Sequence, residues 1–202
     1  MEKVLEISRK LTAPKEQRTQ DLPVNTQVWA SWLKIDLCGD SQIERMVGSA
    51  GRWATSLKAS QAPHWLILLG NSGVGKTHTA NRLWKWLKTR ADFSEIGAYY
   101  PERIYWPRFV EELRDGNAYG RYRDMMDWNY LFLDDVASER LSEFSTEKLH
   151  TLLGARIGKW TIITSNKGMA DVAELDPRIA SRFMRDGSEI VDIRTTDYNL
   201  RK

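Results

Sequence analysis

The feature that most constrains this chain is the octapeptide GNSGVGKT at residues 70–77, which matches the pattern G-x-x-x-x-G-K-[ST] in full. The apolar run WLILLG leads into it, and the sequence THTANRLWKWL continues from it with helical periodicity. A strand, a glycine-rich loop and a helix in this order form the context in which the pattern binds the phosphates of a nucleotide. The chain is therefore expected to carry this loop at the carboxyl end of a buried strand.

The residue types in the loop have separate tasks. Glycines let the backbone curl so that amide groups point at the phosphates, and the start of the following helix adds partial positive charge. Lys76 is expected to reach the β- and γ-phosphates, and the Thr77 hydroxyl to coordinate Mg²⁺. ATP and Mg²⁺ are the predicted cofactors, and the predicted nucleotide-binding residues are Gly70, Asn71, Ser72, Gly73, Val74, Gly75, Lys76, Thr77 and His78.

Short apolar segments alternate with helical patterns along the rest of the chain. Strands are predicted at residues 64–69, 104–106, 129–133, 161–164 and 189–193, and helices near residues 76–90, 108–115, 145–157 and 170–184. This alternation indicates an α/β fold, with a parallel sheet covered by helices on both faces. Another helix is predicted from Ser41, which with Glu44 fits a capping box, to near Ser60.

Polar side chains follow two of the predicted strands. Asp134 and Asp135 end the apolar run YLFL, and Asn166 follows TIITS. In a parallel sheet the carboxyl ends of the strands face the ligand crevice. Asp134 is then the candidate partner of Mg²⁺, and Asp135 is the candidate base that activates water. Asn166 is the candidate to hydrogen-bond the γ-phosphate or that water, with an ordinary strand-to-loop cap as the alternative.

The composition of the chain argues against a secretory signal, a membrane span and a strongly basic overall charge. The N-terminus, MEKVLEISRK, lacks an apolar signal core, and no apolar run approaches the ~20 residues that span a bilayer. A cytoplasmic protein without a membrane partner is expected. The formal net charge is only +3, so contact with nucleic acid requires a local basic patch.

Taken in order, the segments GNSGVGKTH, LFLDDVASERLSE, TIITSN, DPRIASRF and DYNLR resemble the AAA+ ATPases of the bacterial helicase-loader and insertion-sequence-helper family (DnaC/IstB-like). The resemblance begins near residue 64 and extends to residue 201. It implies a P-loop sheet of five parallel strands sandwiched by helices. We expect the chain to depart from the family pattern in two ways, with only a short N-terminal helical extension and with no C-terminal lid. Residues 1–40 are then an N-terminal arm or partner-binding segment, and residues 41–202 the AAA+ ATPase domain.

The resemblance also assigns roles to single residues. Asp134 and Asp135 correspond to the Walker B carboxylates, and Asn166 corresponds to the residue called sensor 1. Arg182 corresponds to the arginine finger that enters the site of the next subunit, so the catalytic set is completed by a neighbour. Two further arginines are weaker candidates at the same subunit boundary, Arg178 and Arg156.

The family binds single-stranded DNA between the second strand and Walker B, and the sequence AYGRYR at 118–123 lies in this region. Arginines with interleaved aromatic rings can grip phosphates and stack on bases. The alternative is that these arginines pair with nearby acidic residues. The predicted DNA contacts are Tyr119, Arg121, Tyr122 and Arg123.

The implied function is that of an ATPase that assembles head to tail with copies of itself into a ring or filament. As a DNA-replication factor it would act on single-stranded DNA as a helicase loader, with a replicative helicase as its partner. Two alternatives stay open. One is a transposition helper that recruits a transposase to DNA, and the other is a nucleotide-gated adaptor that hydrolyses little ATP.

Overall fold

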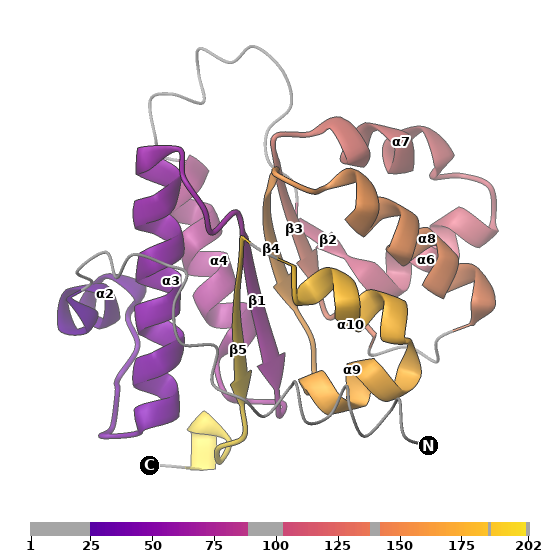
Figure 1. Cartoon of the computed structure of the whole chain (residues 1–202). Coiled ribbons are helices and arrows are strands. Elements are labelled where there is room, and N and C mark those ends of the chain that lie inside the picture. Colours follow the sequence, from indigo (N-terminus) through magenta and orange to yellow (C-terminus); the bar gives the residue numbers. More distant parts are fainter. Residues whose placement is uncertain (1–24, 89–102, 138–141, 186, 201–202) are drawn as a thin grey trace.

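The structure, a computed structural model, describes residues 25–88, 103–137, 142–185 and 187–200 (Figure 1). Its centre is a five-stranded parallel sheet in the order β2-β3-β4-β1-β5. The strands are β1 (Trp65–Gly70), β2 (Arg103–Tyr105), β3 (Tyr130–Asp134), β4 (Trp160–Thr164) and β5 (Ser188–Ile193). The predicted α/β fold is confirmed. Because β4 lies between β3 and β1, the acidic strand end, the strand before Asn166 and the phosphate loop are neighbours.

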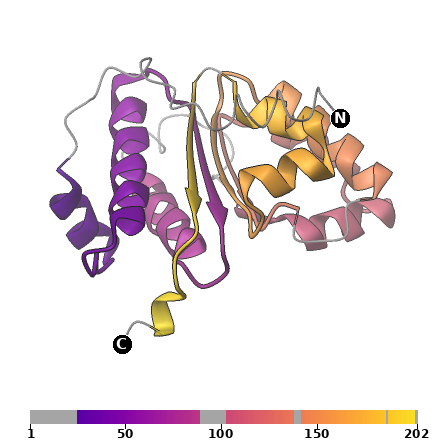
Figure 2. The same cartoon turned by 60° about the horizontal axis from the view of Figure 1, so that its bottom comes forward.

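Helices cover both faces of the sheet (Figure 2). One face carries α3 (Ser41–Ala59) and α4 (Lys76–Lys88), and the other carries α6 (Trp106–Arg114), α7 (Tyr119–Asp127), α8 (Glu143–Ala155), α9 (Met169–Leu175) and α10 (Pro177–Phe183). Alternate side chains of β1 enter the two cores, Leu66 and Leu68 on one side and Ile67 and Leu69 on the other. Within the described part of the chain, no helix combines the length and the apolar character needed to cross a membrane.

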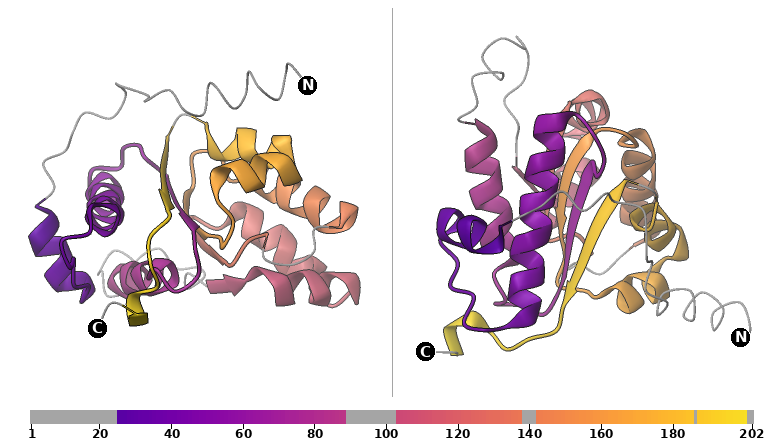
Figure 3. Two further views of the ribbon diagram at one scale, coloured as in Figure 1. Left: turned by 90° about the horizontal axis from the view of Figure 1, so that it is seen from below. Right: turned by 60° about the vertical axis from the view of Figure 1, so that its left-hand side comes forward.

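The helix α2 (Thr26–Leu33) packs against α3 and α4 on the side away from the sheet (Figure 3). Three indole rings hold it there, because Trp29, Trp32 and Trp86 of α4 meet edge to face with centroids 5.8–6.2 Å apart. Residues 1–24 of the predicted N-terminal segment lie outside the described residues, and the division at residue 40 stays a prediction.

The N-terminal cap of α3 differs from the predicted capping box. The carboxylate of Asp40 accepts the backbone N–H groups of Gln42 and Ile43, at 2.8 and 3.3 Å. Ser41 is therefore the first helical residue and not the cap. An aspartate is as good a cap as a serine and also complements the positive end of the helix dipole.

Proline residues account for two other boundaries that the sequence pattern places wrongly. The predicted strand 104–106 ends one residue early, because Trp106 begins α6 and Pro107 lies in its first turn. The predicted helix 170–184 is two helices, since Pro177 begins α10 and the extended Asp176 caps it. The helix α7 has no counterpart among the predicted elements.

Candidate nucleotide-binding site

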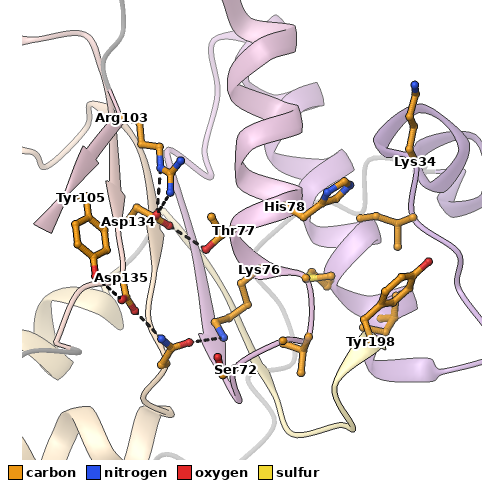
Figure 4. A pocket seen from close by; sticks show the side chains of 17 residues that line it. Lys34, Ser72, Lys76, Thr77, His78, Arg103, Tyr105, Asp134, Asp135 and Tyr198 are labelled. Carbon is orange, nitrogen blue, oxygen red and sulfur yellow. Dashed lines mark hydrogen bonds and ion pairs between the residues drawn. The ribbon is translucent and has the colours of Figure 1, made fainter. Parts of the chain in front are cut away.

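A cavity of about 530 Å³ lies beside the phosphate loop, at the carboxyl ends of the central strands (Figure 4). Its size is in the range of small-molecule sites. Its walls come from the phosphate loop, the ends of β2 and β3, the second residue after β4, the segment between α2 and α3, α3 itself, and the short 3₁₀ helix η1 (Tyr198–Leu200). Predicted residues in its lining are Ser72, Gly73, Val74, Gly75, Lys76, Thr77, His78, Asp134, Asp135 and Asn166.

The phosphate loop fits its surroundings only with glycine at two positions. Gly70 and Gly73 have φ angles of +119° and +76°, which side chains of L-amino acids rarely allow. A Cβ atom on Gly70 would lie 1.9 Å from the backbone oxygen of Ile193, and one on Gly73 would lie 1.9 Å from the carboxylate of Asp197. The loop is thus closely packed against the chain that follows β5.

Lys76 supplies the positive charge of the loop. It begins α4, and its buried Nζ donates to two backbone oxygens of the loop, at 2.9 and 2.5 Å, and to Asn166 Oδ1 at 3.0 Å. Burial lowers the pKa of Lys76 to about 8, although the carboxylates of Asp135 and Asp134 oppose that shift. The ammonium group is still protonated at neutral pH and is held by oxygens that a phosphate oxygen can replace.

This pKa predicts how nucleotide affinity depends on pH. In the free protein Lys76 loses its proton as the pH rises through about 8, whereas a bound phosphate holds the proton on. The dissociation constant for ATP should therefore rise above pH 8, by up to about tenfold per pH unit. Equilibrium ATP titrations at several pH values between about 6.5 and 9.5 measure this dependence of the dissociation constant on pH. Lys85→Ala, on the exposed side of the same helix, should show the same profile, and an affinity that does not change with pH would contradict the assignment.

Asp134 is buried at the end of β3, and both of its oxygens are held. Oδ1 accepts the hydroxyl groups of Thr77 and Thr164, at 3.0 and 2.7 Å. Oδ2 accepts two hydrogen bonds from the guanidinium group of Arg103 on β2. The two predicted magnesium ligands, Thr77 and Asp134, therefore lie together and offer the hard oxygen atoms that Mg²⁺ prefers.

Asp135 has an unusual backbone conformation, with φ of +61°. Outside glycine such angles are found mostly at asparagine and aspartate, and they persist where the surroundings impose them. Here the backbone N–H donates to Thr164 Oγ1 at 2.9 Å, and Asn166 Nδ2 donates to Asp135 Oδ1 at 2.7 Å. The Tyr105 hydroxyl donates to Oδ2 at 3.5 Å. Asn166 thus links the Lys76 ammonium group of the phosphate loop to Asp135, the candidate base (Figure 4).

Arg182 does not reach this cavity. It lies on α10, where its Nη2 is 3.5 Å from His150 Nε2, and it lines a small hollow together with His64 and Ser188. These two residues flank the amino ends of β1 and β5, whereas the phosphate loop follows the carboxyl end of β1. Arg182 is therefore too far away to contact a nucleotide in its own subunit.

The two weaker arginine candidates differ from Arg182. Arg156 is fully buried and donates to several backbone carbonyls, among them those of Met125 at 3.1 Å and Trp160 at 2.8 Å. It ties the loops around β3 and β4 together and cannot reach another subunit, so this hypothesis is wrong. Arg178 is exposed, and its guanidinium is paired with Asp176 at 2.9 Å.

Three of the four predicted DNA-contacting residues, Tyr119, Arg121 and Arg123, lie exposed on α7. The fourth, Tyr122, is buried, and its hydroxyl donates to a backbone carbonyl of α8 at 2.7 Å. Burial raises the pKa of Tyr122 to about 12. Its ring fills the core and cannot stack on a base, so this part of the prediction is wrong. The guanidinium of Arg121 lies 3.9 Å from the Glu112 carboxylate, as the alternative interpretation expects.

Seven of the described residues that line the cavity were not predicted: Lys34, Ile35, Ile43, Met46, Arg103, Tyr105 and Tyr198. Three of these, Arg103, Tyr105 and Tyr198, carry a ring or a guanidinium group. Arg103 and Tyr105 reach the cavity because β2 pairs with β3 in a register that places Tyr105 opposite Asp134. Tyr198 reaches it from the segment after β5. The sequence signal for all three was weak: the first two lie in a stretch rich in aromatic and basic residues, and Tyr198 lies in the DYNLR segment, to which no role was assigned.

Comparison with known proteins agrees with this geometry. A family model described as IstB-like ATP binding protein matches residues 54–202. The chromosomal replication initiator protein DnaA of Jannaschia sp. (strain CCS1) is 32% identical over 155 residues, which are 76% of this chain and 32% of that protein. The chain thus spans about a third of the length of this relative.

Solved structures share the fold at low sequence identity. The DnaC helicase loader superposes with a TM-score of 0.61 and 21% identity, over 76% of this chain and 91% of that one. DnaI gives a TM-score of 0.64 and 22% identity, over 81% and 89%. The replication initiator DnaA bound to AMPPCP and single-stranded DNA gives a TM-score of 0.59 and 20% identity, over 74% and 46%. At these identities the likeness establishes an AAA+ fold.

Proposed function

Because the chain belongs to the family of IstB-like ATP-binding proteins, we propose that it is an ATPase that works in DNA replication, most directly as a helicase loader acting on single-stranded DNA. The observation that carries the proposal is the convergence of five predicted residues on one cavity. Lys76, Thr77, Asp134, Asp135 and Asn166 line it, while Arg182 lies at the opposite end of the sheet.

The site residues divide the hydrolytic chemistry among themselves. Lys76 and the loop amides bind the phosphates, and Thr77 and Asp134 are placed to hold Mg²⁺, which neutralises phosphate charge when it is bound. Asp135 accepts a proton from the attacking water, and Asn166 orients that water or the γ-phosphate. Thr164 holds both aspartates, with Asp134 accepting its hydroxyl and the Asp135 N–H donating to it.

A neighbouring subunit completes this site. Arg182 cannot stabilise charge on a nucleotide in its own chain, but a head-to-tail neighbour can present it to the phosphates. Such a contact joins two different surfaces of the protein, so it closes into a ring or continues as a filament. The proposed partner is therefore first of all another copy of this chain.

The DNA-directed part of the proposal draws on the relatives and on α7. One structural relative is a helicase loader, and another is a replication initiator with single-stranded DNA bound. On α7, Arg121, Arg123 and Tyr119 are all exposed, and Lys148 Nζ of α8 lies 5.6 Å from the centre of the Tyr119 ring. Cations next to an aromatic ring suit a single strand, whose phosphates and bases are both accessible. A replicative helicase is the proposed protein partner.

A second candidate function has one specific observation in its favour. The family model that matches the chain is that of the IstB-like proteins, which agrees with a transposition helper that recruits a transposase to DNA. Both candidates require ATP turnover and DNA binding, so the partner separates them. ATP-dependent capture of a purified replicative helicase supports the loader, and capture of a purified transposase supports the helper.

The DNA contact is tested with a double variant, Arg121→Ala with Arg123→Ala. Its affinity for single-stranded DNA should fall, and the slope of log affinity against log salt should shrink by about 0.7 for each phosphate that is no longer neutralised. Fluorescence anisotropy with a labelled oligonucleotide at several salt concentrations measures both. Lys85→Ala with Lys88→Ala, which removes two exposed charges from α4, is the matched control and should change neither.

ATP turnover measured in the same samples, with and without the oligonucleotide, tests the proposal as a whole. We expect DNA to stimulate turnover in the parent and in the control, and to stimulate it less in the double variant. Turnover that stays near zero in the parent with DNA present would instead indicate a nucleotide-gated adaptor. Equal affinity and equal salt slope in all three proteins would exclude the α7 patch.

A further inference from the structure

The nucleotide cavity extends past the phosphate loop on the side away from Asp134 and Asp135 (Figure 4). That part of the wall is apolar. It consists of side chains from the segment between α2 and α3, from α3 and from the loop itself: Ile35, Ile43, Met46 and Val74. The carboxylates mark the end of the cavity where the γ-phosphate reacts. The opposite, apolar end is therefore the place for the base of the nucleotide.

Among the described residues that line the cavity, Tyr198 is the one tyrosine at this apolar end. The imidazole ring of His78 also lies on this side, where its Nε2 is 3.0 Å from the backbone oxygen of Leu33. The other tyrosine of the lining, Tyr105, lies beside Asp135 at the reactive end. Every nucleobase has a π-face, and a tyrosine ring is a common platform for it. The half-buried Tyr198 ring is thus the candidate surface for the base.

The backbone around Tyr198 is fixed to the phosphate loop. Its N–H donates to the carbonyl of Gly73 at 3.0 Å, and the N–H of Asn71 donates to the carbonyl of Ile193 at 3.0 Å. Between these two points, the Thr195 hydroxyl donates to Oδ2 of Asp40, the N-terminal cap of α3, at 2.5 Å. The ring is therefore held at a defined place relative to the phosphates, which lowers the entropy cost of stacking a base on it.

We propose that Tyr198 stacks on the base of the bound nucleoside triphosphate, so that the segment after β5 contributes this ring to the base-binding end of the site. This inference rests on the proposed binding of ATP at the phosphate loop. It adds a residue that acts on the base alone. The phosphates and the reacting water lie at the other end of the cavity and are served by Lys76, Asp135 and Asn166.

The test compares two ligands that share the triphosphate but differ in the base. Tyr198→Leu keeps an apolar side chain without a ring, and Tyr198→Phe keeps the ring. Tyr198→Leu should bind ATP about 5- to 100-fold more weakly, and Tyr198→Phe should stay within about twofold of the parent. Inorganic triphosphate, which has no base, should compete equally well for all three proteins. At saturating ATP, turnover should be retained, so the change falls on KM.

Other outcomes overturn the inference. ATP affinity equal to the parent in Tyr198→Leu means that the ring does not touch the base. Weaker binding of inorganic triphosphate along with ATP means that the tyrosine only supports the loop. Lys76→Ala separates these failures from failure of the proposed function, since it should weaken both ligands. A parent protein that binds neither ligand would refute the ATP site itself.

Discussion

Arg182→Ala is expected to bind ATP with nearly the affinity of the parent and to lose about 10³- to 10⁵-fold in turnover. The reason is geometric. Arg182 lies at the amino end of the sheet and lines a hollow with His64 and Ser188, so it contributes nothing to the cavity in its own subunit. In the assembly, Arg182 would supply the positive charge that stabilises the transition state in the ATP site of the neighbouring subunit. Equilibrium binding and phosphate release at saturating ATP measure the two effects separately.

Arg178→Ala is the matched control on the same helix. Its guanidinium is exposed and paired with Asp176 at 2.9 Å. Turnover should change by less than about tenfold, because an exposed ion pair contributes little. A large loss of turnover in Arg178→Ala and no loss in Arg182→Ala would indicate that Arg178 is the arginine finger. In the parent, turnover per subunit should rise with protein concentration, because each site needs a neighbour.

Asp135→Asn is expected to retain Mg²⁺-ATP binding and to lose about 10²- to 10⁴-fold in turnover. The substitution removes a proton acceptor and keeps the shape. Asparagine tolerates the φ of +61° as well as aspartate does, and its carbonyl oxygen can still accept the hydrogen bond from Asn166. Phosphate release and nucleotide binding, measured on the same preparation, check the prediction.

The same substitution at the neighbouring residue, Asp134→Asn, is the comparison for Asp135→Asn. Asp134→Asn disturbs the oxygen that faces Thr77 and leaves Arg103 without its ion pair, so Mg²⁺-dependent ATP binding should weaken first. If Asp134→Asn keeps nucleotide binding but loses turnover, and Asp135→Asn loses nucleotide binding, the two roles are reversed. This outcome would place the base on the buried carboxylate that is paired with Arg103.

The five candidate residues that line the cavity could be predicted from sequence because their sequence signals are local. The phosphate loop is a continuous pattern, and Asp134, Asp135 and Asn166 each follow an apolar strand directly. Parallel strands bring such ends together whatever the rest of the chain does. The structure confirms this adjacency, since β4 lies between β3 and β1.

Other residues depend on packing between distant segments. Tyr198 lies more than a hundred residues after the loop in the sequence and reaches it only because β5 pairs with β1. Tyr122 is a different case, because the sequence holds a signal for its burial. With Ala118 and Met125 it forms an apolar face at helical spacing, and all three residues lie in the core. Reading the stretch only as aromatic and basic missed this periodicity.

We propose that each ATP site is built from two subunits. This proposal is tested most directly by mixing Arg182→Ala with Lys76→Ala, each nearly inactive alone. At some interfaces of the mixed assembly, one subunit offers an intact phosphate loop and the other an intact arginine. These are about a quarter of the interfaces in a random equal mixture. We predict that turnover rises on mixing to a comparable fraction of the parent activity. No rise, in samples shown to contain mixed assemblies, would contradict a site shared between subunits.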